Sequence, residues 1–168
     1  CEIDNENWFC YPAKVGELLA FIYFHKDFMA NGIALSNLFE MSNRDEYVGR
    51  NPDIMYVYGA EDLTIDKKIE HKTVFYDDRE NNMMVGLVTY SKDVDYFGYL
   101  KKMTLTLHNL VMIKRGYLPI HGAMVSITLK DGTSSNIVIV GDSGAGKSES
   151  LEAFRSLGEE YISEMKVI

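Results

Sequence analysis

Eight residues near the C-terminal end of the chain restrict its possible folds more than any other segment. They are Gly141-Asp142-Ser143-Gly144-Ala145-Gly146-Lys147-Ser148, which match the phosphate-binding pattern G-x-x-x-x-G-K-[ST] at every fixed position. The largely apolar residues 136–140 before this octet predict a strand, and residues 149–157 after it carry apolar side chains at helical spacing. The sequence therefore predicts a phosphate-binding loop at a strand-to-helix junction.

Each residue type in the octet has a role in binding a polyphosphate. Glycines let backbone N–H groups surround an anion, and the N-terminus of the following helix adds partial positive charge. The Lys147 ammonium can reach the β- and γ-phosphates, and the Ser148 hydroxyl can bind Mg²⁺. We therefore predict that nucleotide phosphate is the main ligand of this chain.

Composition and charge exclude several other functions. An apolar content of 46% over 168 residues is enough for one domain with a core or for two small lobes. The formal charge of −8 disfavours an extended surface for nucleic acid or anionic membrane, and no apolar run is long enough to span a bilayer. Only Cys1 and Cys10 are present, without a C-x-x-C pair, which favours a reducing cytoplasm. We expect small-molecule partners, and the oligomeric state stays open.

Periodicity predicts a mixture of helices and strands in the rest of the chain. Helical spacing is found over residues 15–28, 35–41 and 96–115, with Gly116 as the stop of the longest helix. Strands are predicted over residues 54–58, 73–76 and 83–90. The Asp131-Gly132 step predicts a hairpin between residues 122–129 and 135–140, which leads directly into the octet.

These elements predict an α/β protein with two lobes. Because a hairpin precedes the octet, we expect a mixed sheet in the nucleotide-binding lobe. The predicted boundary lies before the long helix, which gives a small α+β lobe at residues 1–94 and a nucleotide-binding lobe at residues 95–168.

Four segments in the same order resemble the ATP-dependent phosphoenolpyruvate carboxykinases. They are Tyr96-Phe97-Gly98-Tyr99-Leu100-Lys101-Lys102, Leu118-Pro119-Ile120-His121, the hairpin and the octet. His121 follows Lys102 by 19 positions, which is similar to the family spacing. Upstream, Val48-Gly49-Arg50-Asn51-Pro52-Asp53 resembles the substrate loop of the family more loosely. The octet followed by Glu149 also resembles the HPr kinases, which share this P-loop superfamily, so the resemblance implies a P-loop domain of that type.

The carboxykinase resemblance implies two divalent cations, Mg²⁺ or Mn²⁺. Lys102 and His121 would bind one of them, and Ser148 would bind the other together with ATP. A lysine that binds a metal must be neutral, and the neighbouring Lys101 would favour that state by keeping its own proton.

The same resemblance implies the conversion of oxaloacetate and ATP to phosphoenolpyruvate, CO₂ and ADP, a reaction of gluconeogenesis. Arg50 would hold a carboxylate of this small dicarboxylate substrate, and Tyr96 would contact the substrate or CO₂. Lys147 would neutralise the migrating phosphoryl group. The predicted cofactor-binding residues are Gly141, Asp142, Ser143, Gly144, Ala145, Gly146, Lys147, Ser148 and Glu149.

Two alternatives to decarboxylation stay open. One is a kinase of the HPr-kinase type that phosphorylates a hydroxyl of a protein or small molecule, which Glu149 favours. The other is a nucleotide-binding module without catalysis. Phosphoryl transfer also needs an acidic metal ligand after a later strand, and none follows the apolar run that begins near Met165. We therefore expect a fragment that binds nucleotide without turnover, and an enzyme in the full-length form.

Overall fold

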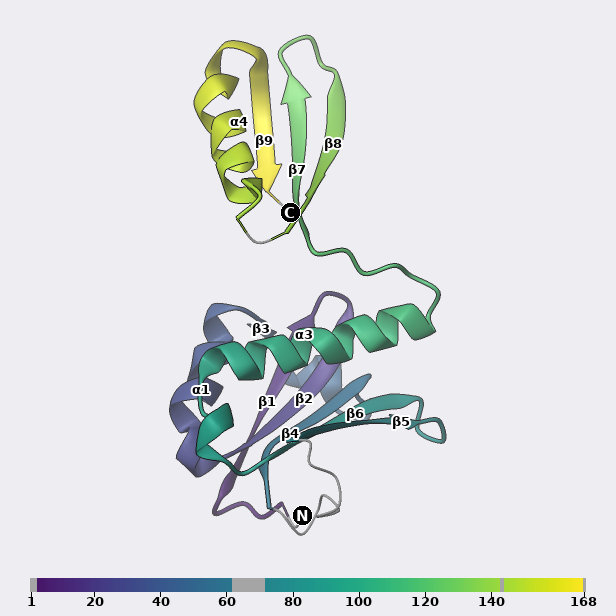
Figure 1. Ribbon diagram of the computed structural model, residues 1–168. Helices are drawn as coiled ribbons and strands as arrows, with labels where there is room; N and C mark the ends of the chain where they lie inside the picture. Colours follow the sequence, from purple (N-terminus) through teal and green to yellow (C-terminus); the bar gives the residue numbers. More distant parts are fainter. Residues whose placement is uncertain (1–2, 62–71, 143, 168) are drawn as a thin grey trace. The chain divides into compact units, whose positions relative to one another are not determined.

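The computed structural model describes residues 3–61, 72–142 and 144–167 (Figure 1). The chain divides into two compact units, Cys1–Tyr117 and Leu118–Ile168, and each unit has its own sheet. Helices are combined with a sheet of parallel and antiparallel strands, which confirms the α/β class at this coarse level. Within the described residues, no helix combines the length and the apolar character needed to cross a bilayer.

The first unit is a six-stranded sheet with helices packed on it. Its main elements are β1 (Trp8–Val15), β2 (Leu18–His25), α1 (Met29–Ala34), β3 (Glu40–Met41), α2 (Arg44–Tyr47), β4 (Ile54–Ala60), β5 (Thr73–Asp78), β6 (Met83–Thr89) and α3 (Phe97–Lys114). The strand order is β3-β1-β2-β4-β6-β5, in which β2, β4 and β6 are parallel and the outer pairings are antiparallel. The strands predicted over residues 54–58, 73–76 and 83–90 are therefore confirmed.

The helix predicted over residues 15–28 is wrong, because most of this segment is strand β2. Gly16 has φ +62°, which allows a tight turn after Val15, and Val15 pairs with Leu18 in an antiparallel hairpin. Leu18, Leu19 and Ala20 are all buried, so the apolar run lacks the alternation that marks a half-exposed strand. Residues 35–41 likewise hold a short 3-10 turn at Leu35–Asn37 and strand β3 in place of one helix.

The main core lies between the sheet and the helices α1 and α3, which cover the same face of the sheet (Figure 1). Helix α3 turns Leu100, Leu107 and Val111 into this core. At Gly86 of β6 a side chain would have its Cβ 2.7 Å from a methyl group of Leu107, so glycine permits the close approach of helix and sheet. The helix ends as predicted, with Gly116 at φ +86° and its N–H donating to Ile113 O at 2.9 Å.

The position of α3 changes the boundary between the two parts of the chain. The sequence suggested a boundary between residues 94 and 95, with the long helix in the nucleotide-binding lobe. In the structure α3 packs on β4 and β6, and the boundary follows Tyr117. The physical reason is the apolar face of α3, which is buried against strands that precede it in the chain.

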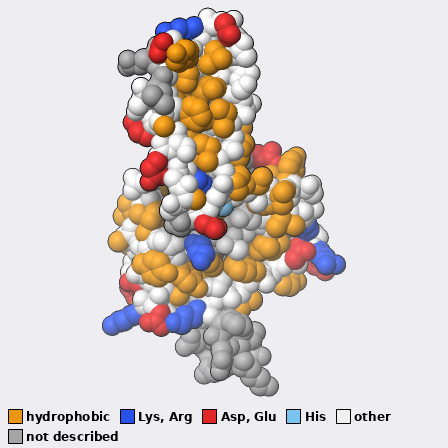
Figure 2. Space-filling view, turned by 45° about the horizontal axis from the view of Figure 1, so that its top comes forward, with side chains coloured by type: hydrophobic (Ala, Val, Ile, Leu, Met, Phe, Trp, Pro, Cys, Tyr) orange, Lys and Arg blue, Asp and Glu red, His pale blue; other side chains and the backbone are white. Residues whose placement is uncertain are grey.

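The second unit is a three-stranded sheet with one helix. It contains β7 (Gly122–Leu129), β8 (Ser134–Val140), α4 (Lys147–Tyr161) and β9 (Ile162–Val167) in the strand order β8-β7-β9. The hairpin of β7 and β8 is confirmed, with Gly132 at φ +88° in its turn. All pairings are antiparallel, so the expected mixed sheet is found in the first unit instead. Figure 2 shows exposed hydrophobic side chains on the visible face of this unit. Val138, Val140 and Tyr161 are among its exposed large hydrophobic residues.

Candidate functional site

The octet connects β8 to α4, as its pattern predicts. Strand β8 ends at Val140 and α4 begins at Lys147, so the loop occupies residues 141–146. Ser143, one of the predicted cofactor-binding residues, lies outside the described residues. The loop therefore has the strand before it and the helix N-terminus after it that phosphate binding requires.

Glycines determine the course of this loop. Gly144 has φ +80° and Gly146, the N-cap of α4, has φ +82°, a left-handed conformation that other residues rarely adopt. At Gly141 a Cβ atom would lie 2.9 Å from the Cβ of Ala145, so the loop folds back closely on its own start. Left-handed glycines alternating with other conformations produce concave arrangements of N–H groups that bind anions. Two left-handed glycines in one short loop are typical of such backbone.

The Lys147 ammonium lies across the start of the loop. Its Nζ donates to Gly141 O at 2.8 Å and to Asp142 O at 2.7 Å. These carbonyls hold the positive charge beside the backbone that phosphates would occupy, and phosphate oxygens can replace them as acceptors. Ser148 and Glu149 are exposed in the first turn of α4.

His121 lies beside the same loop. It precedes Gly122, which pairs with Val140 at the end of the β7–β8 ladder, so His121 stands across from Gly141. His121 is exposed. The second unit therefore brings His121 near Gly141 and Lys147. His121 comes just before the first strand of the hairpin, and Gly141 comes just after the second.

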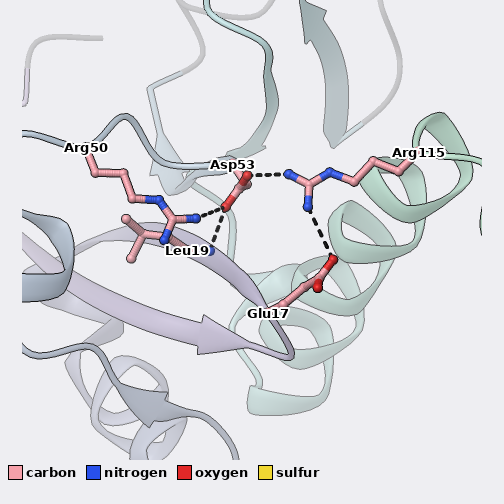
Figure 3. Close-up of polar contacts among 5 residues, drawn as sticks. All are labelled: Glu17, Leu19, Arg50, Asp53 and Arg115. Carbon is pink, nitrogen blue, oxygen red and sulfur yellow. Dashed lines mark hydrogen bonds and ion pairs between the residues drawn. The ribbon is translucent and has the colours of Figure 1, made fainter.

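Arg50 lies in the first unit and is held by a carboxylate. Its guanidinium donates to Asp53 Oδ2 at 3.0 Å, and the same oxygen accepts from the backbone N–H of Leu19 at 2.9 Å (Figure 3). The other Asp53 oxygen accepts from Arg115, which also contacts Glu17 at 3.5 Å. Sequence patterns indicated Arg50 but neither Arg115 nor Glu17, because no local spacing marks residues that meet only after folding.

Arg50 and Tyr96 are not brought together. Arg50 lies beside Asp53 and Arg115, at the C-terminal end of α3, whereas Tyr96 is the N-cap of the same helix. A helix of 18 residues is about 27 Å long. Lys101 and Lys102 are exposed on the first turns of α3, near Tyr96 and far from Arg50. One small substrate cannot contact Arg50 and Tyr96 in this arrangement.

The predicted cation site has ligands from both units, since Lys102 belongs to the first and His121 to the second. Within residues 3–61, 72–142 and 144–167, no three His, Cys, Asp or Glu side chains form a cluster that could hold a metal ion. No protein-family model matches the chain, and no curated protein sequence matches it either.

Proposed function

We propose that residues 141–148 bind the triphosphate of ATP together with Mg²⁺, and that the protein transfers the γ-phosphoryl group. The main support is the position of the Lys147 ammonium, which bonds to two carbonyls of a loop containing the left-handed residues Gly144 and Gly146. A cation, a glycine-rich turn and a helix N-terminus in one place form an anion-binding arrangement.

The residues around the loop suit this chemistry. Lys147 would exchange its carbonyl acceptors for β- and γ-phosphate oxygens, which carry full negative charge and bind it more strongly. Ser148 would bind the Mg²⁺ ion, which would supply further positive charge at the phosphates. His121 precedes Gly122, which pairs with Val140 at the start of the loop, and its imidazole would contact the acceptor or the terminal phosphate.

The proposal can be tested by calorimetric titration of the protein with ATP in the presence of Mg²⁺. Replacing Lys147 by alanine should weaken ATP binding by about tenfold or more. A tenfold change in affinity equals about 1.4 kcal/mol, and one charge-assisted hydrogen bond contributes more than that. Lys166→Ala is the matched control, since Lys166 is an exposed lysine on β9 of the same unit. Equal affinity in the Lys147→Ala variant and the parent would contradict the proposal.

Two phosphoryl acceptors remain candidates. The carboxykinase resemblance suggests the enolate formed from oxaloacetate, which requires Arg50, Tyr96, Lys101 and Lys102 near one substrate. The separation of Arg50 from Tyr96 along α3 argues against that requirement. We therefore propose transfer to a hydroxyl group, as in the HPr-kinase type, ahead of decarboxylation.

The acceptors can be distinguished with ATP and Mn²⁺ in one assay of the full-length protein. Formation of phosphoenolpyruvate from oxaloacetate would support the carboxykinase function, with Lys102 and His121 as cation ligands. Transfer of labelled γ-phosphate to a serine or small-molecule hydroxyl would support the kinase. ATP binding without either reaction would leave a nucleotide-binding module, the third candidate.

A further inference from the structure

The first unit contains a cavity of about 340 Å³ at one edge of its sheet. His25 ends β2, and Gly59 and Glu61 lie at the end of β4, while Tyr90 directly follows β6. Because β2, β4 and β6 are parallel, these residues meet at the carboxyl edge, where open α/β sheets bind their ligands. This cavity is separate from the phosphate-binding loop, which belongs to the second unit.

Three aromatic residues line the cavity, and their rings contact one another. The ring of His25 lies 5.5 Å from that of Trp8 and 5.4 Å from that of Tyr90, and both neighbours are turned by 81° from it. The Tyr90 hydroxyl donates to Asp27, and its backbone N–H donates to Ala60 O at 2.7 Å. These contacts hold the ring in place before any ligand arrives.

Two of the polar residues that line the cavity are carboxylates, and the others are Asn7, His25 and Tyr90. Asp4 and Glu61 line it, and among the residues that the structure describes, no lysine or arginine belongs to its lining. Hydrogen bonds from Asn7 lower the pKa of Asp4, so this carboxylate is charged at neutral pH. Gly59 contributes only backbone, since a Cβ atom there would lie 2.7 Å from the Phe28 ring. The cavity therefore combines aromatic rings with negative charge.

We propose that this cavity binds the alkylammonium group of a small organic cation. Ring faces attract cations through their quadrupole, Trp most strongly, and the carboxylates of Asp4 and Glu61 add attraction between opposite charges. Anions are disfavoured by the same carboxylates. The volume of about 340 Å³ accommodates one small ligand or one side chain. A free amine and a lysine side chain share this chemistry.

Trp8 makes the proposal directly measurable, because it is the only tryptophan of the chain. Its fluorescence should change in a saturable manner when choline is added. The neutral isostere 3,3-dimethylbutan-1-ol, which has the same shape without the charge, should bind at least about threefold more weakly. A parallel titration with N-acetyl-lysine methylamide distinguishes a free amine from a lysine side chain. Tighter binding of this compound than of choline identifies a lysine side chain as the ligand.

Variants measure how much the Glu61 carboxylate contributes to choline binding, apart from the aromatic residues. Glu61→Gln should weaken choline binding by about threefold, the range of an exposed ion pair, while Glu80→Gln, an exposed carboxylate outside the cavity lining, should leave it unchanged. Tyr90→Leu should weaken binding further, and its circular dichroism spectrum verifies that the variant is folded. The proposal is overturned if Trp8 gives no saturable response, if the alcohol binds as well as choline, or if Glu61→Gln and the parent bind equally.

Discussion

The guanidinium of Arg115 donates to Asp53 Oδ1 at 2.5 Å and thereby joins the end of α3 to the loop before β4 (Figure 3). Asp53 is only 13% exposed at its side chain, and it accepts from Arg50 and from the N–H of Leu19 as well. Its backbone extends the ladder between Leu19 and Met84. One carboxylate thus connects β2, β4 and α3.

Replacing Asp53 by alanine should lower the free energy of unfolding of the first unit by about 2–3 kcal/mol, because a largely buried carboxylate with three donors is removed. Urea unfolding followed by Trp8 fluorescence measures this value for the first unit alone. Glu17→Ala is the control: Glu17 contacts Arg115 at 3.5 Å with 64% of its side chain exposed, and should cost less than about 0.5 kcal/mol. Similar losses in the two variants would contradict the role of Asp53.

Tyr56 and Tyr58 offer a matched pair of hydroxyl deletions on β4. The Tyr56 hydroxyl is buried and has no hydrogen-bond partner within the described residues, whereas that of Tyr58 donates to Val94 O. Tyr56→Phe should raise the free energy of unfolding by up to about 1 kcal/mol, since a desolvated hydroxyl is removed, and Tyr58→Phe should lower it by about 1 kcal/mol. Thermal and urea unfolding test both. Equal destabilisation by the two changes would show that Tyr56 does have a partner.

The ion pair of Asp77 and Lys114 predicts a pH effect. Lys114 Nζ donates to Asp77 Oδ1 at 2.6 Å, and this hydrogen bond lowers the pKa of Asp77 from its ordinary value of 3.8. The stabilisation is therefore present above pH 3.8 and is lost as the pH falls through the lower pKa of the folded state. Lys114→Gln should raise the pKa of Asp77, as measured by carboxyl NMR titration. Arg79→Gln should have a smaller effect, because Arg79 contributes less to the shift.

Cys10 should react slowly despite its position on the exposed side of β1. Removal of its thiol from water raises the pKa of Cys10 to about 11, against an ordinary value of 9.0. At pH 8 the thiolate fraction should therefore be about one hundredth of that in an unfolded chain, and alkylation should slow accordingly. Iodoacetamide labelling of a Cys1→Ser variant, with and without urea, measures the ratio. Equal rates in the two conditions would contradict the raised pKa of Cys10.

The parts of the structure that were predicted correctly depend on short-range chemistry. The Asp131-Gly132 step forms its turn within the hairpin, because glycine alone easily adopts φ +88°. The course of the loop at residues 141–146 is likewise specified by nearby glycines and by Lys147, which donates to Gly141 O and Asp142 O. Helix α3 was visible because one of its faces stays exposed and preserves a helical pattern.

The α/β class, the hairpin, the long helix and the glycine-rich loop at residues 141–146 could be predicted from the sequence, because each is encoded by neighbouring residues. The tertiary structure decided that residues 18–25 form a strand, that α3 belongs to the first unit, and that Arg50 stands at the opposite end of α3 from Tyr96. It also gathered Trp8, His25 and Tyr90 around one cavity. These outcomes depend on which apolar faces pack together. A strand that is buried on both faces has no alternation of apolar and polar residues, so the sequence pattern does not identify it as a strand.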